Sequence, residues 1–141
     1  MKRRSKARIW ALQIIYAWEI SGGDLSEIAR EHLRKKKAGE KGKEYTLTLI
    51  PKIEEELEHI DAVIQNTLTT WPIDRLSLID KNILRIGTCE LLFFEDIPEA
   101  VVIDEAIILA NIYGGTDSPK FVNGVLDTIA KQRGKKGCST A

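Results

Sequence analysis

Apolar residues recur at helical spacing along nearly the whole chain, and this pattern constrains the fold more than any other feature. They fall three and four positions apart in successive segments from residue 9 to about residue 130, the spacing of α-helices that bury one face. No segment alternates apolar and polar residues as a half-buried strand does. The sequence therefore predicts an all-α fold without strands.

Glycine, proline and capping residues mark where the predicted helices begin and end. The first helix covers residues 3–20 and ends at Gly22 and Gly23. Asp24 followed by Glu27 has the spacing of a capping box, so a second helix begins there. Four more helices are predicted over about 44–69, over 75–94, from Pro98 to Gly114, and from Ser118 onward.

Three segments are expected to interrupt the helices. Residues 34–43, "RKKKAGEKGK", read as a mobile linker that is either a solvated loop or a nucleic-acid patch. Pro51 lies inside the third helical pattern and predicts a kink or a shorter start. Trp71, in "TWPID", is expected to fill a joint between two halves of the protein.

The length and charge of the chain suit one domain, residues 1–141, with one core. We expect an N-terminal half of about 1–70, a C-terminal half of about 71–134 and a short basic tail. Lys and Arg number 21, as do Asp and Glu, so net charge predicts no partner. Both ends are basic, however, and the middle is acidic, which predicts local positive surfaces.

The sequence gives no indication of export or membrane insertion. The basic N-terminus lacks a signal-peptide pattern, and no apolar stretch approaches the roughly 18 residues of a membrane span. Cys89 lies in a helical pattern and Cys138 in a polar tail, so free thiols in a reducing compartment are expected. These features predict a cytoplasmic protein.

Patterns of catalytic residues are missing from the sequence. His32 and His59 are far apart, and neither has a neighbouring metal ligand. No glycine-rich phosphate loop is present. Asp104 and Glu105 are adjacent carboxylates whose simplest explanation is a favourable position early in a helix. We expect no catalytic residues, no metal and no cofactor.

The first candidate binding feature is the N-terminal run "MKRRSKARIW". It contains Lys2, Arg3, Arg4, Lys6 and Arg8 ahead of a buried helix, and helical geometry puts Arg4 and Arg8 on one side. These cations could neutralise phosphates of a nucleic acid. A frayed and solvated terminus is an equal alternative on composition alone.

The second candidate feature is the helix opening "DSPKFVNG". Ser118 and Pro119 read as the N-cap and first position of the last helix, with free N–H groups that suit an anion. Lys120 adds charge, and Phe121 could stack an unpaired base. Alternatively, Asp117 or Ser118 only caps the helix and Phe121 only fills the core.

The third candidate feature is Glu90, which falls on the inward side of the helix over 75–94. A carboxylate on an apolar face needs a hydrogen-bond partner. That partner is either an internal donor or a donor on another protein.

Four segments in the same order resemble the NusB transcription antitermination factors over nearly the whole chain. They are "ALQIIYAWE", "LRIGTCEL", "IPEAVVIDEAIILA" and "DSPKFVNGVLD". The resemblance implies an all-α fold of two roughly perpendicular three-helix bundles and no enzymatic activity. It also implies binding of single-stranded boxA RNA from ribosomal RNA leaders together with NusE, a small-subunit ribosomal protein, in the antitermination complex of RNA polymerase.

The resemblance also assigns roles to individual residues. Tyr16 and Glu90 correspond to the residues that face NusE. The RNA-binding residues implied are Lys2, Arg3, Arg4, Lys6, Arg8, Asp117, Ser118, Lys120 and Phe121. The cations would supply attraction and register, while the helix opening would contact bases.

Other functions remain open at this stage. A helical protein–protein adaptor would share the fold without touching nucleic acid. An accessory domain like the one preceding the catalytic part of some ribosomal RNA cytosine methyltransferases is a further alternative, although no cofactor-binding pattern occurs here. A DNA-binding helix-turn-helix lacks an evident polar recognition helix.

Overall fold

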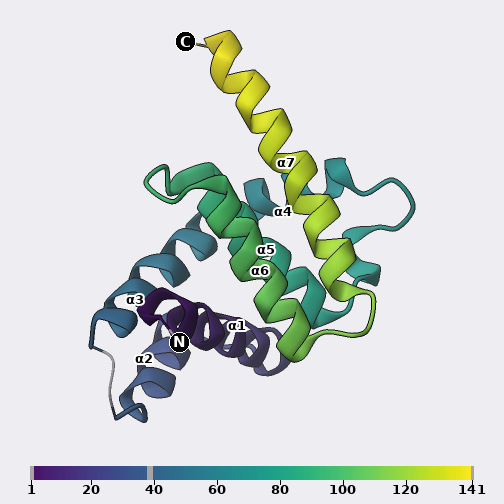
Figure 1. The fold of residues 1–141 in the computed structure, drawn as a ribbon. Coiled ribbons are helices and arrows are strands. Elements are labelled where there is room, and N and C mark those ends of the chain that lie inside the picture. Colours follow the sequence, from purple (N-terminus) through teal and green to yellow (C-terminus); the bar gives the residue numbers. More distant parts are fainter. Residues whose placement is uncertain (1, 38–39, 141) are drawn as a thin grey trace. The chain divides into compact units, whose positions relative to one another are not determined.

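The computed structural model describes residues 2–37 and 40–140, with side chains described up to residue 133. Within these residues every regular element is helical, which confirms the all-α prediction (Figure 1). The chain forms two compact units, Met1–Glu56 and Leu57–Ala141. Helix α4 thus groups with the later helices, whereas the predicted boundary between the halves lies at about residue 70. The expected thiol of Cys138 and the basic side chains after residue 133 lie outside the described side chains.

The first unit is a three-helix bundle. It consists of α1 (Arg3–Ser21), α2 (Leu25–Arg34) and α3 (Glu40–Glu55), and each helix packs on the other two. Its fully buried large side chains are Leu12, Ile14, Ile15, Leu25, Leu49, Ile50 and Ile53. Apolar residues of all three helices therefore form this core.

The turn between α1 and α2 follows the signals in the sequence. Gly22 and Gly23 have φ angles of 73° and 91°, in the left-handed region that favours glycine. The Asp24 carboxylate then accepts a hydrogen bond from the Ser26 N–H at 3.0 Å and caps α2. The predicted end of the first helix and start of the second are confirmed.

The predicted linker over 34–43 is too long, because α3 already begins at Glu40. Gly42 lies inside this helix at a position where a side chain would not fit. A Cβ atom at Gly42 would lie 3.1 Å from the Trp10 ring and 3.2 Å from the Arg3 carbonyl. The missing side chain thus lets α3 approach α1 closely, and the Thr46 hydroxyl donates to the Ala7 carbonyl across the same contact at 3.1 Å.

The break in the predicted helix over 44–69 does not fall at Pro51. Helix α3 runs through Pro51 and ends at Glu55, and α4 (Leu57–Thr67) follows after a single turn residue. Proline removes one backbone hydrogen bond inside a helix. Here the helix continues past it, with Leu49, Ile50 and Ile53 buried on its inner face.

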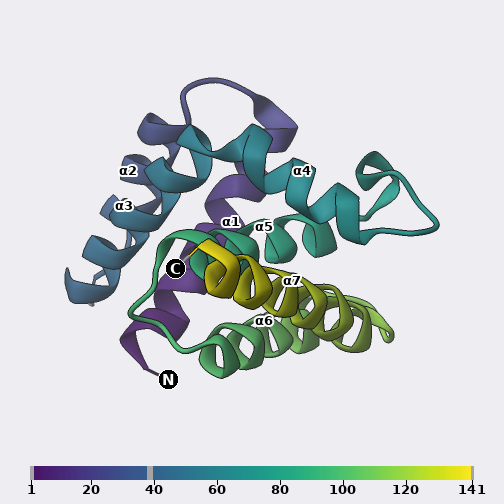
Figure 2. The ribbon, with the colours of Figure 1, turned by 90° about the horizontal axis from the view of Figure 1, so that it is seen from above.

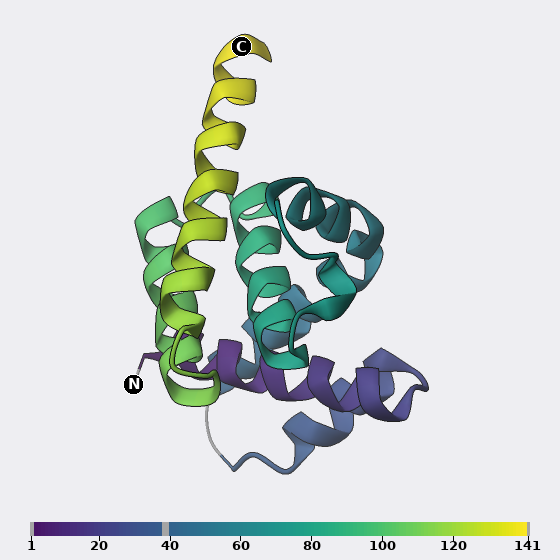
Figure 3. The same cartoon turned by 90° about the vertical axis from the view of Figure 1, so that its right-hand side faces the viewer.

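The second unit is arranged around α5 (Leu78–Phe93), which packs on α4, α6 (Glu99–Tyr113) and α7 (Ser118–Thr140). Helices α6 and α7 run side by side (Figure 2). The last turns of α7 continue beyond α5 and α6 (Figure 3). Every residue from 81 to 91 is buried, so α5 is a central helix with no exposed face along this stretch.

Helix α5 begins later than predicted because a short 3-10 helix precedes it. That element, η1, covers Ile73–Arg75, and the Ser77 hydroxyl caps α5 by accepting from the Asp80 N–H at 3.1 Å. The end of α6 at Gly114 agrees with the prediction. A Cβ atom at Gly114 would lie 2.6 Å from the Ser118 side chain, so close packing requires glycine there.

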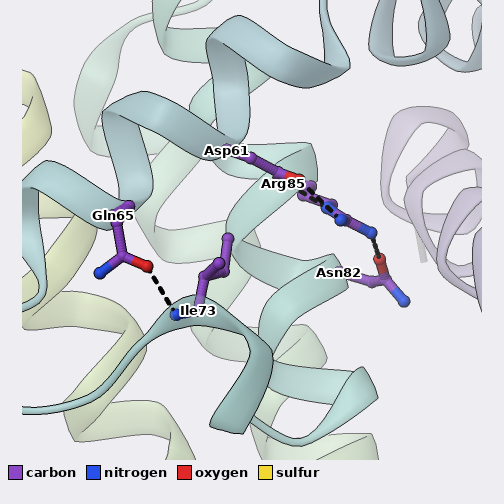
Figure 4. Close-up of polar contacts among 5 residues, drawn as sticks. All are labelled: Asp61, Gln65, Ile73, Asn82 and Arg85. Carbon is purple, nitrogen blue, oxygen red and sulfur yellow. Dashed lines mark hydrogen bonds and ion pairs between the residues drawn. The ribbon is translucent and has the colours of Figure 1, made fainter.

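An ion pair that the sequence analysis did not anticipate joins α4 to α5 (Figure 4). The Arg85 guanidinium donates to both carboxylate oxygens of Asp61 at 2.8 Å, and a third bond at 3.0 Å reaches the Asn82 side chain. Arg85 is buried, and such two-bond pairing is a strong form of ion pair. It fixes α4 against the central helix.

No helix in the described part of the chain is long and apolar enough to cross a membrane.

Candidate nucleic-acid interface

The predicted N-terminal cations lie on the first turns of α1, and the structure divides them into two kinds. Lys2, Arg3, Arg4 and Lys6 are exposed, whereas Arg8 is only 2% exposed. The four exposed side chains are accessible to a ligand. Burial favours a structural role for Arg8, and its RNA contact stays a prediction.

Tyr45 of α3 organises two of these cations. The guanidinium carbon of Arg4 lies 4.7 Å from the centre of the Tyr45 ring, and that of Arg8 lies 5.6 Å away. Both distances suit cation–π contacts. The prediction that Arg4 and Arg8 share one side of the helix is confirmed, and Tyr45 is their common contact.

A pocket of about 370 Å³ opens beside these side chains. Its lining includes Lys41, which lies in the segment 34–43 that was predicted to be either a solvated loop or a nucleic-acid patch. The full lining is Arg3, Arg4, Lys41, Glu44, Tyr45 and Thr48. Tyr45 and Lys41 were missed as site residues because only the packing of α3 on α1 brings them to the cations.

The start of α1 is electrostatically unfavourable. Its first turn contains no acidic residue, and the side chain of the N-cap residue Lys2 makes no capping hydrogen bond. A helix N-terminus carries partial positive charge and is stabilised by anions. Cations at this end repel the helix dipole, so a bound anion would stabilise the arrangement.

The helix opening at the start of α7 differs in detail from the prediction. The helix begins at Ser118, and the Asp117 carbonyl accepts the Phe121 N–H at 3.0 Å, so Asp117 rather than Ser118 is the N-cap. The buried Ser118 hydroxyl accepts from the Gly115 N–H at 2.9 Å. The Ser118 N–H donates to the Gly115 carbonyl, and Pro119 has no N–H. Fewer backbone donors are therefore available to an anion than predicted.

The side chains of this opening are better placed for a ligand than its backbone. Asp117 and Lys120 are exposed, and Phe121 is half-buried. Phe121, Asp117 and Ser118 line a pocket of about 560 Å³. It remains a prediction that the RNA bases contact Asp117, Ser118, Lys120 and Phe121. The exposure of Asp117 and Lys120 and the pocket at this opening support it.

Trp71 lines the same pocket and is 53% exposed. The expectation that Trp71 fills a joint between two halves is therefore wrong. Its side chain lies on the surface of the second unit, where Arg75 lies 6.0 Å from its ring centre. Sequence reasoning missed Trp71 as a site residue because a tryptophan next to a turn usually packs inward.

The two residues predicted to face NusE differ in accessibility. Tyr16 on α1 is 37% exposed, and Ile20, one helical turn later, is also exposed. Glu90 is only 1% exposed and already has an interaction within the chain. Tyr16 is thus accessible to a partner as the structure stands, while Glu90 is not.

A further exposed apolar stripe lies on α6. Val101, Ile108 and Ile112 are all exposed and fall at helical spacing along one side. The sequence did not indicate this stripe, because α6 is apolar on most sides and its pattern does not show which side faces the core.

One histidine in the first unit has a shifted pKa. Burial, followed by the charges of Lys36 and Lys35, lowers the pKa of His32 below its usual value. The His32 Nε2 lies 2.9 Å from the Gln13 side-chain oxygen, which links α2 to α1.

The described residues contain no cluster of metal-ligating side chains. Cys89 is buried and forms no disulfide within them. The candidate interface consists instead of exposed cations, aromatic side chains and pockets.

The comparison with known families decides what kind of protein carries these features. The sequence model of the NusB family matches residues 5–131. This chain belongs to the NusB family. The match begins within the first turn of α1, after Arg3 and Arg4, and includes the rest of α1, the opening of α7 and the helices between them.

Individual NusB proteins are similar over most of their length. The transcription antitermination protein NusB of Nitratiruptor is 39% identical over 132 residues, covering 94% of each chain. The Thermotoga maritima NusB is 50% identical over 96 residues, which cover 68% of each chain.

Solved NusB structures have the same fold. A T. maritima NusB structure superposes with a TM-score of 0.86 at 42% identity, covering 93% of this chain and 92% of that one. A crystal structure of the antitermination factors NusB and NusE in complex with double-stranded RNA gives a TM-score of 0.85 at 32% identity, covering 94% and 98%. These matches confirm the NusB-like fold predicted from the sequence.

Proposed function

We propose that this chain is a transcription antitermination factor that binds boxA RNA together with NusE and joins the RNA polymerase antitermination complex. Family membership supports the role in transcription. The role proposed is one of binding rather than catalysis, in the bacterial cytoplasm, where transcription occurs. The solved complex of NusB and NusE with double-stranded RNA supports NusE and RNA as partners, and the single-stranded form of the RNA is part of the proposal.

The start of α1 is the observation that carries the proposal. Exposed Arg3, Arg4 and Lys6 surround a helix N-terminus that has no acidic residue and no side-chain cap. Phosphates would satisfy both the cations and the positive helix end. This arrangement costs stability in the free protein and favours binding of a polyanion.

The opening of α7 supplies the contacts that distinguish bases. In single-stranded RNA the bases are open to stacking and to hydrogen bonding at their edges. Phe121 offers an aromatic face, and the exposed Asp117 carboxylate accepts hydrogen bonds. Lys120 adds a cation for the adjoining phosphate.

NusE binding is assigned to the exposed face of α1 that contains Tyr16 and Ile20. These side chains are four residues apart and form one apolar patch with a polar hydroxyl. Aromatic residues of this kind are frequent at protein interfaces. Glu90 contacts NusE directly only if binding exposes its carboxylate.

Fluorescence anisotropy of labelled RNA tests the proposal. The probes are a single-stranded boxA RNA, the same sequence as a duplex, and a scrambled strand of equal composition, each with and without NusE. We expect boxA to bind most tightly and NusE to strengthen it. Equal affinity for boxA and the scrambled strand in the presence of NusE would contradict the proposal.

A matched pair of variants separates the two surfaces. Tyr16→Ala should weaken NusE binding and leave the RNA affinity of the isolated protein unchanged. Arg4→Ala should weaken the RNA affinity of the isolated protein and leave NusE binding unchanged. Equal loss of both activities in both variants would contradict this division.

A helical adaptor that binds protein alone is the second candidate, and the exposed stripe of Val101, Ile108 and Ile112 on α6 favours it. Such an adaptor would bind NusE but would show no salt-dependent RNA binding. The same anisotropy experiment therefore distinguishes it.

A further inference from the structure

Two aromatic side chains line one pocket of the second unit. Trp71 precedes η1, and Phe121 lies in the first turn of α7. Trp71 exposes more than half of its surface, although burying an aromatic side chain is favourable. An exposed aromatic surface that lines a pocket is typical of a binding site.

The segment that carries Trp71 is held in place from α4. The Gln65 side-chain oxygen accepts a hydrogen bond from the Ile73 N–H at 2.7 Å (Figure 4). The Gln65 amide nitrogen donates to the Trp71 carbonyl at 3.4 Å. Arg75 lies near the outer edge of cation–π range, 6.0 Å from the Trp71 ring centre. These contacts fix the backbone from the Trp71 carbonyl to Ile73, so this wall of the pocket is formed before a ligand binds.

The charges around the pocket select against a phosphate. Carboxylates of Asp80 and Asp117 line it, against the single cation Arg75. Asp80 Oδ1 is buried, and the described residues supply it with no hydrogen-bond donor. Carboxylates repel a phosphate but accept hydrogen bonds from the N–H groups of a nucleobase.

The size of the pocket also fits a nucleobase. Its volume is about 560 Å³, within the roughly 300–1,000 Å³ of sites for small organic groups. Bases of single-stranded nucleic acids stack on aromatic side chains irrespective of sequence.

We propose that this pocket takes one unstacked base of the bound RNA against Trp71 and Phe121. The proposal rests on the RNA-binding function proposed above and adds Trp71, Arg75 and Asp80 to the surface. Trp71 supplies the stacking face, and Gln65 is a positioning residue that acts through the Trp71 segment.

A series of single-stranded boxA RNAs, each with one base removed, tests the pocket. Affinities are measured for the wild type, Trp71→Ala, Trp71→Phe and Ile112→Ala. Ile112 is an exposed apolar residue of the same unit outside the pocket. Thermal unfolding by circular dichroism checks that each variant folds.

We expect Trp71→Ala to bind the intact RNA about tenfold more weakly. Trp71→Phe should retain most of the affinity because the aromatic face remains, and Ile112→Ala should match the wild type. At one RNA position, removal of the base should cost the wild type about tenfold and cost Trp71→Ala almost nothing.

Two results would contradict the proposal, and they are distinguishable. The pocket is not a base site if the wild type and Trp71→Ala bind boxA RNA equally well and if removal of each base costs both proteins the same affinity. If the folded wild type with NusE does not bind boxA RNA at all, the RNA-binding function itself fails, and the base pocket fails with it.

Discussion

The guanidinium of Arg4 lies 4.7 Å from the ring centre of Tyr45, so a cation on α1 is positioned by an aromatic residue on α3. Arg3 and Lys41 line the pocket beside this pair. A cation held in this way loses less conformational freedom when it binds a phosphate than a fully mobile one does. Tyr45 therefore gives the Arg4 guanidinium a defined position, which would suit the binding of a phosphate.

Arg4→Ala should weaken the binding of all RNAs alike. The slope of log affinity against log salt should become shallower by roughly 0.7 for the one lost single-strand phosphate contact. Anisotropy titrations at several salt concentrations measure the slope. Glu44→Gln, which removes a carboxylate from the same pocket, is the matched control and should not weaken binding. An unchanged slope in Arg4→Ala would show that this cation does not contact RNA.

Arg8→Ala should act mainly on stability, because this side chain is buried against Tyr45. We expect a loss of about 1–3 kcal/mol in the free energy of unfolding. Lys6→Ala, at an exposed position of the same helix, should stay within about 0.5 kcal/mol of the wild type. Urea denaturation measures both. A stable Arg8→Ala protein with reduced RNA affinity would instead identify Arg8 as an RNA contact.

Phe121→Ala should reduce boxA affinity by about 1–3 kcal/mol through lost stacking. Its half-buried ring makes some loss of stability inevitable, so affinity is measured well below the unfolding midpoint. Phe121→Tyr keeps the aromatic face and serves as the control. Wild-type affinity in folded Phe121→Ala would assign the ring to packing alone.

Asp61→Asn should destabilise the second unit strongly. It weakens the acceptor of the buried Arg85 guanidinium, which makes two hydrogen bonds of 2.8 Å to Asp61. A loss of up to about 3 kcal/mol is expected, because Arg85 is buried although the Asp61 carboxylate is partly exposed. Glu99→Gln disrupts the more exposed 3.5 Å pair with Arg133 and should cost less than about 1 kcal/mol. If thermal or urea unfolding shows that Asp61→Asn and Glu99→Gln lose similar free energies of unfolding, the Arg85–Asp61 pair is not the more important of the two.

The stability of the first unit should depend on pH through His32. Its pKa in the folded protein lies below the ordinary value of 6.5, so the unfolded chain takes up a proton first as the pH falls. The contribution of His32 is therefore complete above about pH 6.5 and is lost as the pH falls toward the folded pKa. His32→Gln should flatten this part of the stability profile measured by urea denaturation. An unchanged profile would exclude His32 as its source.

The sequence was informative where local chemistry decides the structure. Gly22, Gly23 and Asp24 ended one helix and began the next as predicted, because backbone freedom and capping act within a few residues. Pro51 shows the limit of such rules. Its local effect was insufficient to end α3, whose Leu49, Ile50 and Ile53 are held by the core.

Features that depend on distant residues were not predictable in the same way. The ion pair between the buried Arg85 and the partly exposed Asp61 joins two helices, and neither residue indicates its partner in the sequence. Likewise, Trp71 and Phe121 are far apart in the sequence and line one pocket only because α4 and α5 pack against α7. The apolar spacing identified helices, but the solvent-exposed side of α6 depended on its neighbours.

We propose that one RNA strand contacts both the cations of α1 and the opening of α7. Titration of ¹⁵N-labelled protein with boxA RNA, followed by NMR, tests it most directly. We predict that amide signals of residues 2–6 and of residues 116–121 shift together and saturate with one shared Kd. Shifts confined to one of these segments, or two clearly different Kd values, would contradict the account.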